Sequence, residues 1–268
     1  MKFTPGEMRV KFPGDTYSHK PAGAGIVPAA AAMYSRIFAG PLAWLCHKAA
    51  KGKCDDYAWV WASDWLTDIL EDYCPLEACG LDYFRKLDGP CVVVANHMST
   101  LETFVLPGML RPSRPVTFVV KKSLVEMPFF GPVMRSRDPL VVGRKSPRED
   151  LATVINGGRE MLEKDISIVV FPQSTRSLEF DIRHFNTIGV KLAQRAGVPV
   201  VPLALKTDAW GQGKIIRDFG RIRRGMPVRF RFGAPIEIQG NGKSEHAAIC
   251  DFISSTLADW QAQDGVNK

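Results

Sequence analysis

The segment Asn96-His97-Met98-Ser99-Thr100-Leu101-Glu102 carries the residue types from which an enzyme builds a general base. It directly follows the apolar run 91–95. A histidine changes its protonation near neutral pH, and a carboxylate five residues later can orient the ring and stabilise its charged form. His97 and Glu102 are therefore a candidate pair of base and acid, and an enzyme is the leading interpretation.

The same segment also fits a capping box that opens a helix, with Ser99 as N-cap and Glu102 three residues later. Capping alone accounts for Glu102. His97 precedes the cap, between the end of a predicted strand and the start of a helix, and ligands gather at such places in open α/β sheets. On this segment alone, a structural histidine and a catalytic one are about equally well supported.

Short β-branched runs separated by helical patterns predict the elements that must hold this segment. The predicted strands are 91–95, 116–120, 140–142, 166–171, 198–205 and 228–232. Helices are predicted to start at the N-cap Ser146, to run over about 187–196 up to Gly197, and to start at Ser244. This alternation predicts an α/β fold with a mostly parallel or mixed central sheet flanked by helices.

The chain divides into three predicted parts. Residues 1–25 are rich in proline and glycine and predict a flexible lead-in, residues 26–85 predict a helical N-terminal region, and residues 86–268 hold the main domain. Within the second part, 26–50 combines apolar residues with basic flanks, which suits a helix in a bilayer interface as well as a helix packed on the domain. We expect no signal peptide and no transmembrane span, because no apolar run reaches about 20 residues.

The formal net charge of +7 comes with basic clusters at 121–122, 135–148 and 214–231. These clusters suit phosphate-bearing substrates, a nucleotide-containing cofactor or an acidic membrane surface. Nucleic acid is not an expected partner, because the chain lacks a Cys/His finger spacing and an aromatic-rich single-strand-binding pattern. The six cysteines show no C-x2-C pair, so we expect reduced thiols and no metal, with a zinc site as a remote alternative.

Three further segments place polar residues or prolines just after apolar runs, and with the first segment they make four blocks. The blocks are Asn96-His97…Glu102, Lys122…Pro128…Gly131…Arg144, Phe171-Pro172-Gln173-Ser174-Thr175-Arg176-Ser177 and Val201-Pro202. In this order they resemble the glycerolipid acyltransferase family typified by 1-acylglycerol-3-phosphate acyltransferase. That family's blocks read roughly NHxxxxD, a lysine-to-arginine block with an internal P-x2-G, FPEGTRS and a VP-containing strand.

Two departures from the family's pattern matter most. Glu102 stands where aspartate is usual, which keeps the charge and lengthens the side chain by one methylene. Gln173-Ser174 replaces Glu-Gly, which removes an anionic side chain and adds a hydroxyl. We expect these changes to affect the acceptor's identity more than the chemistry, with Gln173 contacting the acceptor's polar head and redirecting acceptor choice.

The resemblance implies an O-acyltransferase of phospholipid synthesis, whose residues 86–268 form the acyltransferase domain. It would move a fatty acyl group from acyl-CoA or acyl-carrier protein to the free hydroxyl of a lysophospholipid, with 1-acylglycerol 3-phosphate as the first candidate. His97 would be the general base, oriented by Glu102. The implied substrate-binding residues are Arg176, Arg144, Lys122, Gln173, Ser174 and Thr175. Arginine suits this role because its guanidinium matches phosphate geometry.

The resemblance also implies a peripheral position on the cytoplasmic face of a membrane, with the anionic surface as a partner. No cofactor is expected beyond the acyl thioester. Other acceptors stay open, including lyso-ornithine lipid, a lipid A precursor or another lysolipid. A non-catalytic relative that binds lipid or CoA, and a hydrolase in which the same base activates water, are the alternatives from other classes.

Overall fold

The computed structural model describes residues 10–21, 30–144, 146–173, 175–213 and 218–266. Its strands are β1 (Tyr17–His19), β2 (Leu76–Cys79), β3 (Val92–Ala95), β4 (Val116–Lys121), β5 (Leu140–Val142), β6 (Ser167–Val170), β7 (Val200–Lys206) and β8 (Val228–Phe232). Its helices are α1 (Ala30–Ile37), η1 (Phe38–Leu42), α2 (Ala43–Ala50), α3 (Asp56–Glu71), α4 (Asp82–Arg85), α5 (Leu101–Leu110), α6 (Lys122–Val125), α7 (Gly131–Arg135), α8 (Pro147–Leu162), η2 (Ile182–His184), α9 (Ile188–Ala196) and α10 (Lys243–Val266).

Within these residues, eight strands form one mixed sheet in the order β1-β2-β8-β7-β3-β6-β4-β5. Strands β7, β3, β6, β4 and β5 are parallel to one another, so their carboxyl ends lie along one edge. Strand β8 is antiparallel to β7 and parallel to β2, and β1 is antiparallel to β2. The predicted α/β fold with a mixed sheet is confirmed.

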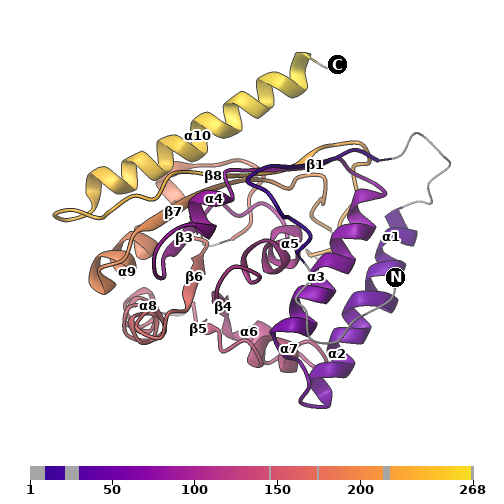
Figure 1. Cartoon of the computed structure of the whole chain (residues 1–268), viewed down its shortest axis with the longest axis horizontal. Helices are drawn as coiled ribbons and strands as arrows, with labels where there is room; N and C mark the ends of the chain where they lie inside the picture. Colours follow the sequence, from indigo (N-terminus) through magenta and orange to yellow (C-terminus); the bar gives the residue numbers. More distant parts are fainter. Residues whose placement is uncertain (1–9, 22–29, 145, 174, 214–217, 267–268) are drawn as a thin grey trace.

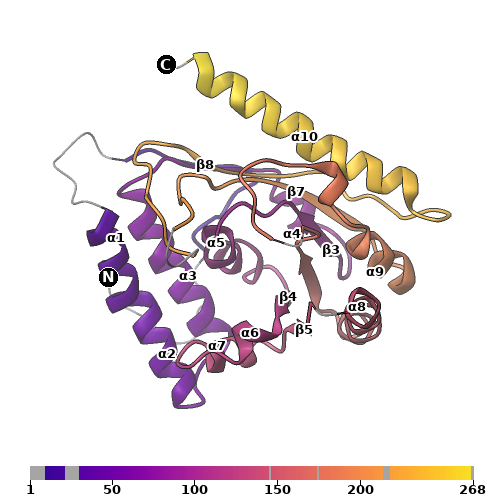
Figure 2. The same cartoon turned by 180° about the vertical axis from the view of Figure 1, so that it is seen from behind.

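Side chains of the central strands alternate between two cores, because successive residues of a strand point to opposite faces. Val93 and Ala95 of β3 belong to a core with residues of α1, α3 and α5. Val92 and Val94 belong to a second core with residues of α8, α9 and α10. Helices α1, α2 and α3 group on the side away from α8 and α9, and α10 runs along the sheet (Figures 1 and 2). The result is a helix–sheet–helix sandwich.

The N-terminal part differs from its prediction in two places. Residues 17–19, expected in a flexible lead-in, form an edge strand paired with β2, and β2 itself lies inside the region expected to be helical. Side-chain contacts hold this stretch on α3. The Nζ atom of Lys11 lies 2.6 Å from Asp68 and 2.7 Å from Glu71, and the Tyr17 hydroxyl also binds Glu71. The flexible lead-in was predicted from its proline and glycine content, which carries no information about partners as distant in sequence as Asp68 and Glu71.

The predicted helix boundaries at Ser146 and Gly197 are confirmed, while α10 begins at Lys243, one residue before the predicted start at Ser244. The side chain of Ser146 caps α8 by accepting from the Glu149 N–H, and Gly197 ends α9 in the left-handed conformation, with φ of 66°. Of the segment 26–50, residues 30–50 form α1, η1 and α2, while residues 26–29 lie outside the described part. In the described part of the chain, no helix has both the length and the apolar character needed to cross a membrane.

Candidate active site

His97 follows the carboxyl end of β3 and faces Glu102 in the first turn of α5. Its Nδ1 lies 2.8 Å from Glu102 Oε1. An ionised carboxylate only accepts hydrogen bonds, so in the neutral ring Nδ1 carries the proton and Nε2 keeps its lone pair. About 15% of the His97 side chain is exposed. The ring is therefore oriented as a general base requires.

The Glu102 carboxylate is fully buried and surrounded by donors. Besides His97, Oε1 accepts from the backbone N–H groups of Met98 (2.7 Å) and Ser99 (2.9 Å). Oε2 lies 2.9 Å from Ser99 Oγ and 2.6 Å from Thr207 Oγ1. Burial acts to raise the pKa of this carboxyl, but hydrogen bonds and charge from His97, with the bonds from Thr207 and Ser99, bring the pKa below its ordinary value. Glu102 is therefore ionised at neutral pH.

The start of α5 differs from the predicted capping box, because the N-cap is Thr100 rather than Ser99 and its side chain makes no capping hydrogen bond. Glu102 accepts from the backbone N–H of Ser99, which is one half of the predicted capping box. The Ser99 hydroxyl instead accepts from the N–H of Leu101 at 3.1 Å, and α5 begins at Leu101. One carboxylate thus holds both the loop before α5 and the histidine ring.

The loop after β6 packs directly on His97. The ring of Phe171 stacks on the imidazole, with centroids 4.4 Å apart and planes at 20°. Gln173 Oε1 accepts from the His97 backbone N–H at 2.6 Å, and the Ser177 N–H donates to the His97 carbonyl at 2.9 Å. The third block therefore fixes the histidine on both sides of its backbone. Ser174 lies outside the described residues.

Asn96 ties the first block to the strand of the fourth block. Its side-chain amide donates to the carbonyl of Leu205 at 2.8 Å, and its Oδ1 accepts from the N–H of the same residue at 2.8 Å. This buried bridge continues the β3–β7 pairing past the last paired residues. The residue before the histidine thus sets the position of the histidine relative to the sheet.

Arg176 lies beside the start of α5. Its guanidinium pairs with the carboxylate of Asp218 and contacts the hydroxyl of Thr100, which itself lies 3.1 Å from Asp218. An acidic partner already in place holds the guanidinium at the edge of the site.

Arg144 follows β5 and adopts a positive φ of 57°. Its backbone N–H and that of Gly143 both donate to the carboxylate of Asp150, at 2.9 and 2.8 Å, which fixes the turn. Partial burial, together with the positive charge of Arg176, lowers the pKa of Arg144, and Asp150 partly offsets this. The two arginines of separate blocks are therefore close enough to repel each other.

The catalytic candidate and most of the substrate-binding candidates share one cavity of about 1510 Å³. Its polar lining includes His97, Thr100, Arg144, Gln173, Thr175 and Arg176. Its apolar lining comes mainly from η1, α2, α3, α5, β4 and the turns around α6 and α7. Such a volume exceeds the roughly 300–1,000 Å³ of pockets for a single small ligand. The cavity is thus large enough for two substrates.

Lys122 is the candidate that the structure does not bring to this cavity. Its side chain is 64% exposed, and its Nζ lies 3.5 Å from Glu126 on the same surface turn. The preceding Lys121, at the end of β4, lines the cavity instead. Both lysines are exposed, but Lys121 is the last residue of β4 and borders the cavity, whereas Lys122 begins α6 and does not.

A model of the family described as acyltransferase matches residues 76–206, which contain all four blocks. Residues 76–206 form an acyltransferase-family domain, and the resemblance to the glycerolipid acyltransferases is confirmed. The 1-acyl-sn-glycerol-3-phosphate acyltransferase of Pseudomonas aeruginosa is 33% identical over 146 residues, which are 54% of this chain and 54% of that protein. The enzyme of the same name from Escherichia coli K12 is 29% identical over 168 residues, which are 62% of this chain and 65% of that protein. The chain thus matches about half to two thirds of the length of these relatives.

The fold of this chain has a solved counterpart. The crystal structure of the 1-acyl-sn-glycerophosphate acyltransferase PlsC from Thermotoga maritima aligns with a TM-score of 0.63 at 17% identity. The alignment covers 87% of this chain and 95% of that one. The likeness therefore extends beyond the residues that the family model matches.

Three residues complete the site, of which sequence reasoning missed Thr207 and Asp218 and named Phe171 only as part of the third block. Thr207 binds Glu102, Phe171 stacks on His97, and Asp218 pairs with Arg176. Thr207 directly follows β7, so the rule that polar residues at strand carboxyl ends converge could have found it. Asp218 lies in a loop without a recognisable motif, and only the fold brings it to Arg176.

Proposed function

We propose that this protein transfers a fatty acyl group from an acyl thioester to the free hydroxyl of 1-acylglycerol 3-phosphate. The observation that carries the proposal is the His97–Glu102 pair on a large cavity that two arginines also line. The names of the curated relatives support the choice of acceptor.

The base step follows from the geometry of the pair. A lysolipid hydroxyl within hydrogen-bond reach of His97 Nε2 transfers its proton to the ring as its oxygen attacks the thioester carbonyl. Glu102 stabilises the imidazolium through Nδ1–H and keeps the ring from turning. Collapse of the tetrahedral intermediate breaks the carbon–sulfur bond, and the imidazolium returns the proton to the leaving sulfur. The products are the diacylated lipid and the free thiol.

Direct transfer between the two substrates is favoured over an acyl-enzyme. The sequence contains no G-x-S-x-G elbow that would present a nucleophilic serine. A cavity of about 1510 Å³ suits a lysolipid and an acyl chain held together. His97 then acts on the acceptor hydroxyl itself.

Arg144 and Arg176 are proposed to bind the acceptor phosphate. Both line the cavity, and the positive charge of Arg176 contributes to the lowered pKa of Arg144. A phosphate dianion between them would relieve this repulsion and accept hydrogen bonds from both guanidinium groups. The same interaction would place the glycerol hydroxyl of the acceptor toward His97.

A lipid surface is the proposed source of the acceptor. Three large apolar side chains that line the cavity are also exposed, namely Phe38 (44%), Met127 (44%) and Phe129 (86%). Exposed apolar groups at a cavity rim typically mark interaction sites, and Lys121 lines the same cavity, where it can attract anionic headgroups. A lysolipid could then enter without its chain crossing water.

The test is a mass-spectrometric product analysis of the full chain with mixed lysolipids, offered with acyl-CoA and with acyl-carrier protein. The proposal predicts a diacylglycerol 3-phosphate product that depends on the thioester. Free fatty acid without an esterified acceptor would identify a hydrolase, and lipid or CoA binding with no product would identify a non-catalytic relative. Esterification of a different lysolipid alone would overturn the choice of acceptor.

A further inference from the structure

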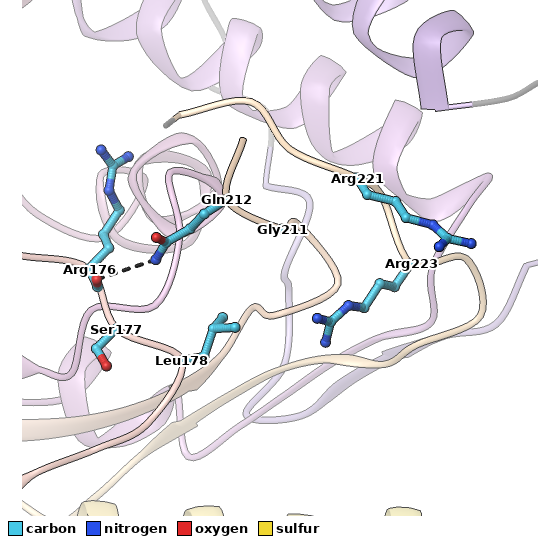
Figure 3. Close-up of a pocket in the computed structure, with 7 residues that line it drawn as sticks. All are labelled: Arg176, Ser177, Leu178, Gly211, Gln212, Arg221 and Arg223. Carbon is cyan, nitrogen blue, oxygen red and sulfur yellow. Dashed lines mark hydrogen bonds between the residues drawn. The ribbon is translucent and has the colours of Figure 1, made fainter. Parts of the chain in front are cut away.

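We propose that a second, basic pocket beside the cavity binds the phosphate groups of a coenzyme A donor. The pocket has a volume of about 460 Å³ and is lined by Arg176, Ser177, Leu178, Gly211, Gln212, Arg221 and Arg223 (Figure 3). This volume lies within the roughly 300–1,000 Å³ of small-ligand pockets. The inference rests on the proposed function, since it assigns the donor's place at the same site.

The wall of this pocket is a closely packed pair of extended segments after β7. Gly211 N–H donates to the carbonyl of Arg221 at 3.0 Å, and Arg223 N–H donates to the carbonyl of Ala209 at 2.8 Å. A Cβ atom at Gly211 would lie 2.7 Å from the Arg221 carbonyl oxygen, and one at Gly220 would overlap the backbone of residue 212. Gly211 and Gly220 thus allow the two segments to pack closely, and Arg221 and Arg223 both lie on the second segment.

The pocket carries an excess of positive charge. No carboxylate of the described residues forms an ion pair with the exposed Arg221. The Arg223 guanidinium lies 3.8 Å from Asp208, but Lys206 binds the same carboxylate more closely, at 2.8 Å. The one carboxylate near Arg223 among the described residues is therefore already paired with a lysine, and Arg221 lines the same pocket. An anion with several oxygen acceptors is the ligand that this arrangement favours.

The pocket adjoins the catalytic candidate through the backbone of the third block. Ser177 lines the pocket and its N–H binds the His97 carbonyl at 2.9 Å. The amide of Gln212 donates to the Arg176 carbonyl at 3.3 Å (Figure 3). In the same view the Arg176 side chain points away from Arg221 and Arg223, and its guanidinium lines the large cavity. Arg176 thus separates two anion-binding regions.

This separation fits the chemistry of a coenzyme A thioester. The pantetheine arm separates the phosphate groups of coenzyme A from its sulfur. A donor whose thioester reacts at His97 must therefore bind its phosphate groups outside the reacting centre. Arg144 and Arg176 are proposed to bind the acceptor's phosphate, which leaves the donor's phosphates in need of other cations. Arg221 and Arg223 provide them.

The test measures coenzyme A binding to the full chain by calorimetry, with the double variants R221Q/R223Q and R221K/R223K. Removal of both charges should weaken binding about tenfold or more, and lysine should restore part of it, because charge-assisted hydrogen bonds to phosphate are lost and then partly replaced. The control is R159Q on α8, a half-exposed arginine that pairs with Glu163 and lies in neither pocket. It should bind as the wild type does.

A kinetic arm compares an acyl-CoA with the corresponding acyl-pantetheine, which lacks the phosphates. R221Q/R223Q should raise KM for acyl-CoA and leave both the acyl-pantetheine values and KM for the lysolipid unchanged. Equal coenzyme A binding by wild type and R221Q/R223Q, or a rise in KM for the lysolipid alone, would overturn the assignment. If no thioester supports transfer, the proposed function fails, while calorimetry still decides on the pocket.

Discussion

The side-chain oxygen of Gln173 accepts a 2.6 Å hydrogen bond from the backbone N–H of His97. Gln173 is only 5% exposed, so this bond forms in a nearly water-free environment. The glutamate that the family usually carries at this position could accept the same bond. Gln173 therefore keeps the positioning of the histidine and changes the charge of the site by one unit.

Gln173→Glu is expected to keep His97 in place and to disfavour anionic acceptors. The added negative charge would lie on the cavity that Arg144 and Arg176 also line, so KM for 1-acylglycerol 3-phosphate should rise several-fold relative to that for an uncharged monoacylglycerol. The measurement is a comparison of kcat and KM for the two acceptors. An unchanged acceptor profile would show that Gln173 takes no part in acceptor choice.

Glu102→Gln is expected to reduce kcat by about 10²- to 10⁴-fold, because an amide can present a donor to Nδ1 and support the wrong tautomer. It should also destabilise the fold by about 3 kcal/mol at neutral pH, since the buried N–H and hydroxyl donors lose an anionic acceptor. Steady-state kinetics and urea unfolding at pH 7 measure the two effects.

The stability loss in Glu102→Gln should depend on pH. The pKa of Glu102 is lower in the folded protein than in the unfolded chain, so the ionised carboxylate contributes its full stabilisation above the ordinary glutamate pKa of about 4.3. That contribution falls as pH drops below this value toward the folded pKa. Unfolding free energies of wild type and variant should therefore converge in acid, and a difference that stays constant from pH 7 to pH 3 would contradict the assigned charge.

Arg144→Ala is expected to weaken acceptor binding without removing the base. Loss of a charge-assisted contact to phosphate should raise KM for 1-acylglycerol 3-phosphate about tenfold or more and leave kcat within a few-fold. An acceptor without phosphate serves as the internal control, since its KM should stay the same. Equal effects on both acceptors would argue for a structural role of Arg144 in the turn that Asp150 holds.

Gly108→Ala is expected to destabilise the packing of α5 on α3. A Cβ atom at this position would lie 3.0 Å from Ser63 Oγ and closer still to the buried carboxylate of Asp64, so the helices must separate or shift, at a cost of about 1–3 kcal/mol. Gly265→Ala near the end of α10 is the matched control, because nothing lies within 4 Å of its added Cβ. Thermal unfolding of the two variants should show a lower midpoint for Gly108→Ala only.

The sequence predicted best those features that depend on residues close together in the chain. The β-branched runs gave the six main strands, and Ser146 and Gly197 marked helix ends through capping groups that act within a few residues. The pairing of His97 with Glu102 was predictable for the same reason, since five residues across a strand-to-helix turn bring the two side chains together.

Contacts between distant parts of the chain were less predictable. Thr207 binds Glu102, although the two residues are 105 positions apart in the sequence. The strand order that brings them together cannot be predicted from any single segment. The sequence predicted Lys122 as a substrate-binding residue, but Lys121 lines the cavity, because β4 ends at Lys121 and α6 begins at Lys122. Edge strand β1 was missed because Lys11 and Tyr17 are held by acidic residues of α3.

The central claim is that His97 removes the proton from the acceptor hydroxyl. The most direct measurement is acyl transfer by His97→Ala, with mass spectrometry of the lipid products and thermal unfolding of the same preparation. Transfer should fall by about 10³-fold or more, while the variant unfolds cooperatively near the wild-type temperature. A folded His97→Ala protein that still forms diacylglycerol 3-phosphate at a rate close to that of the wild type would contradict the claim.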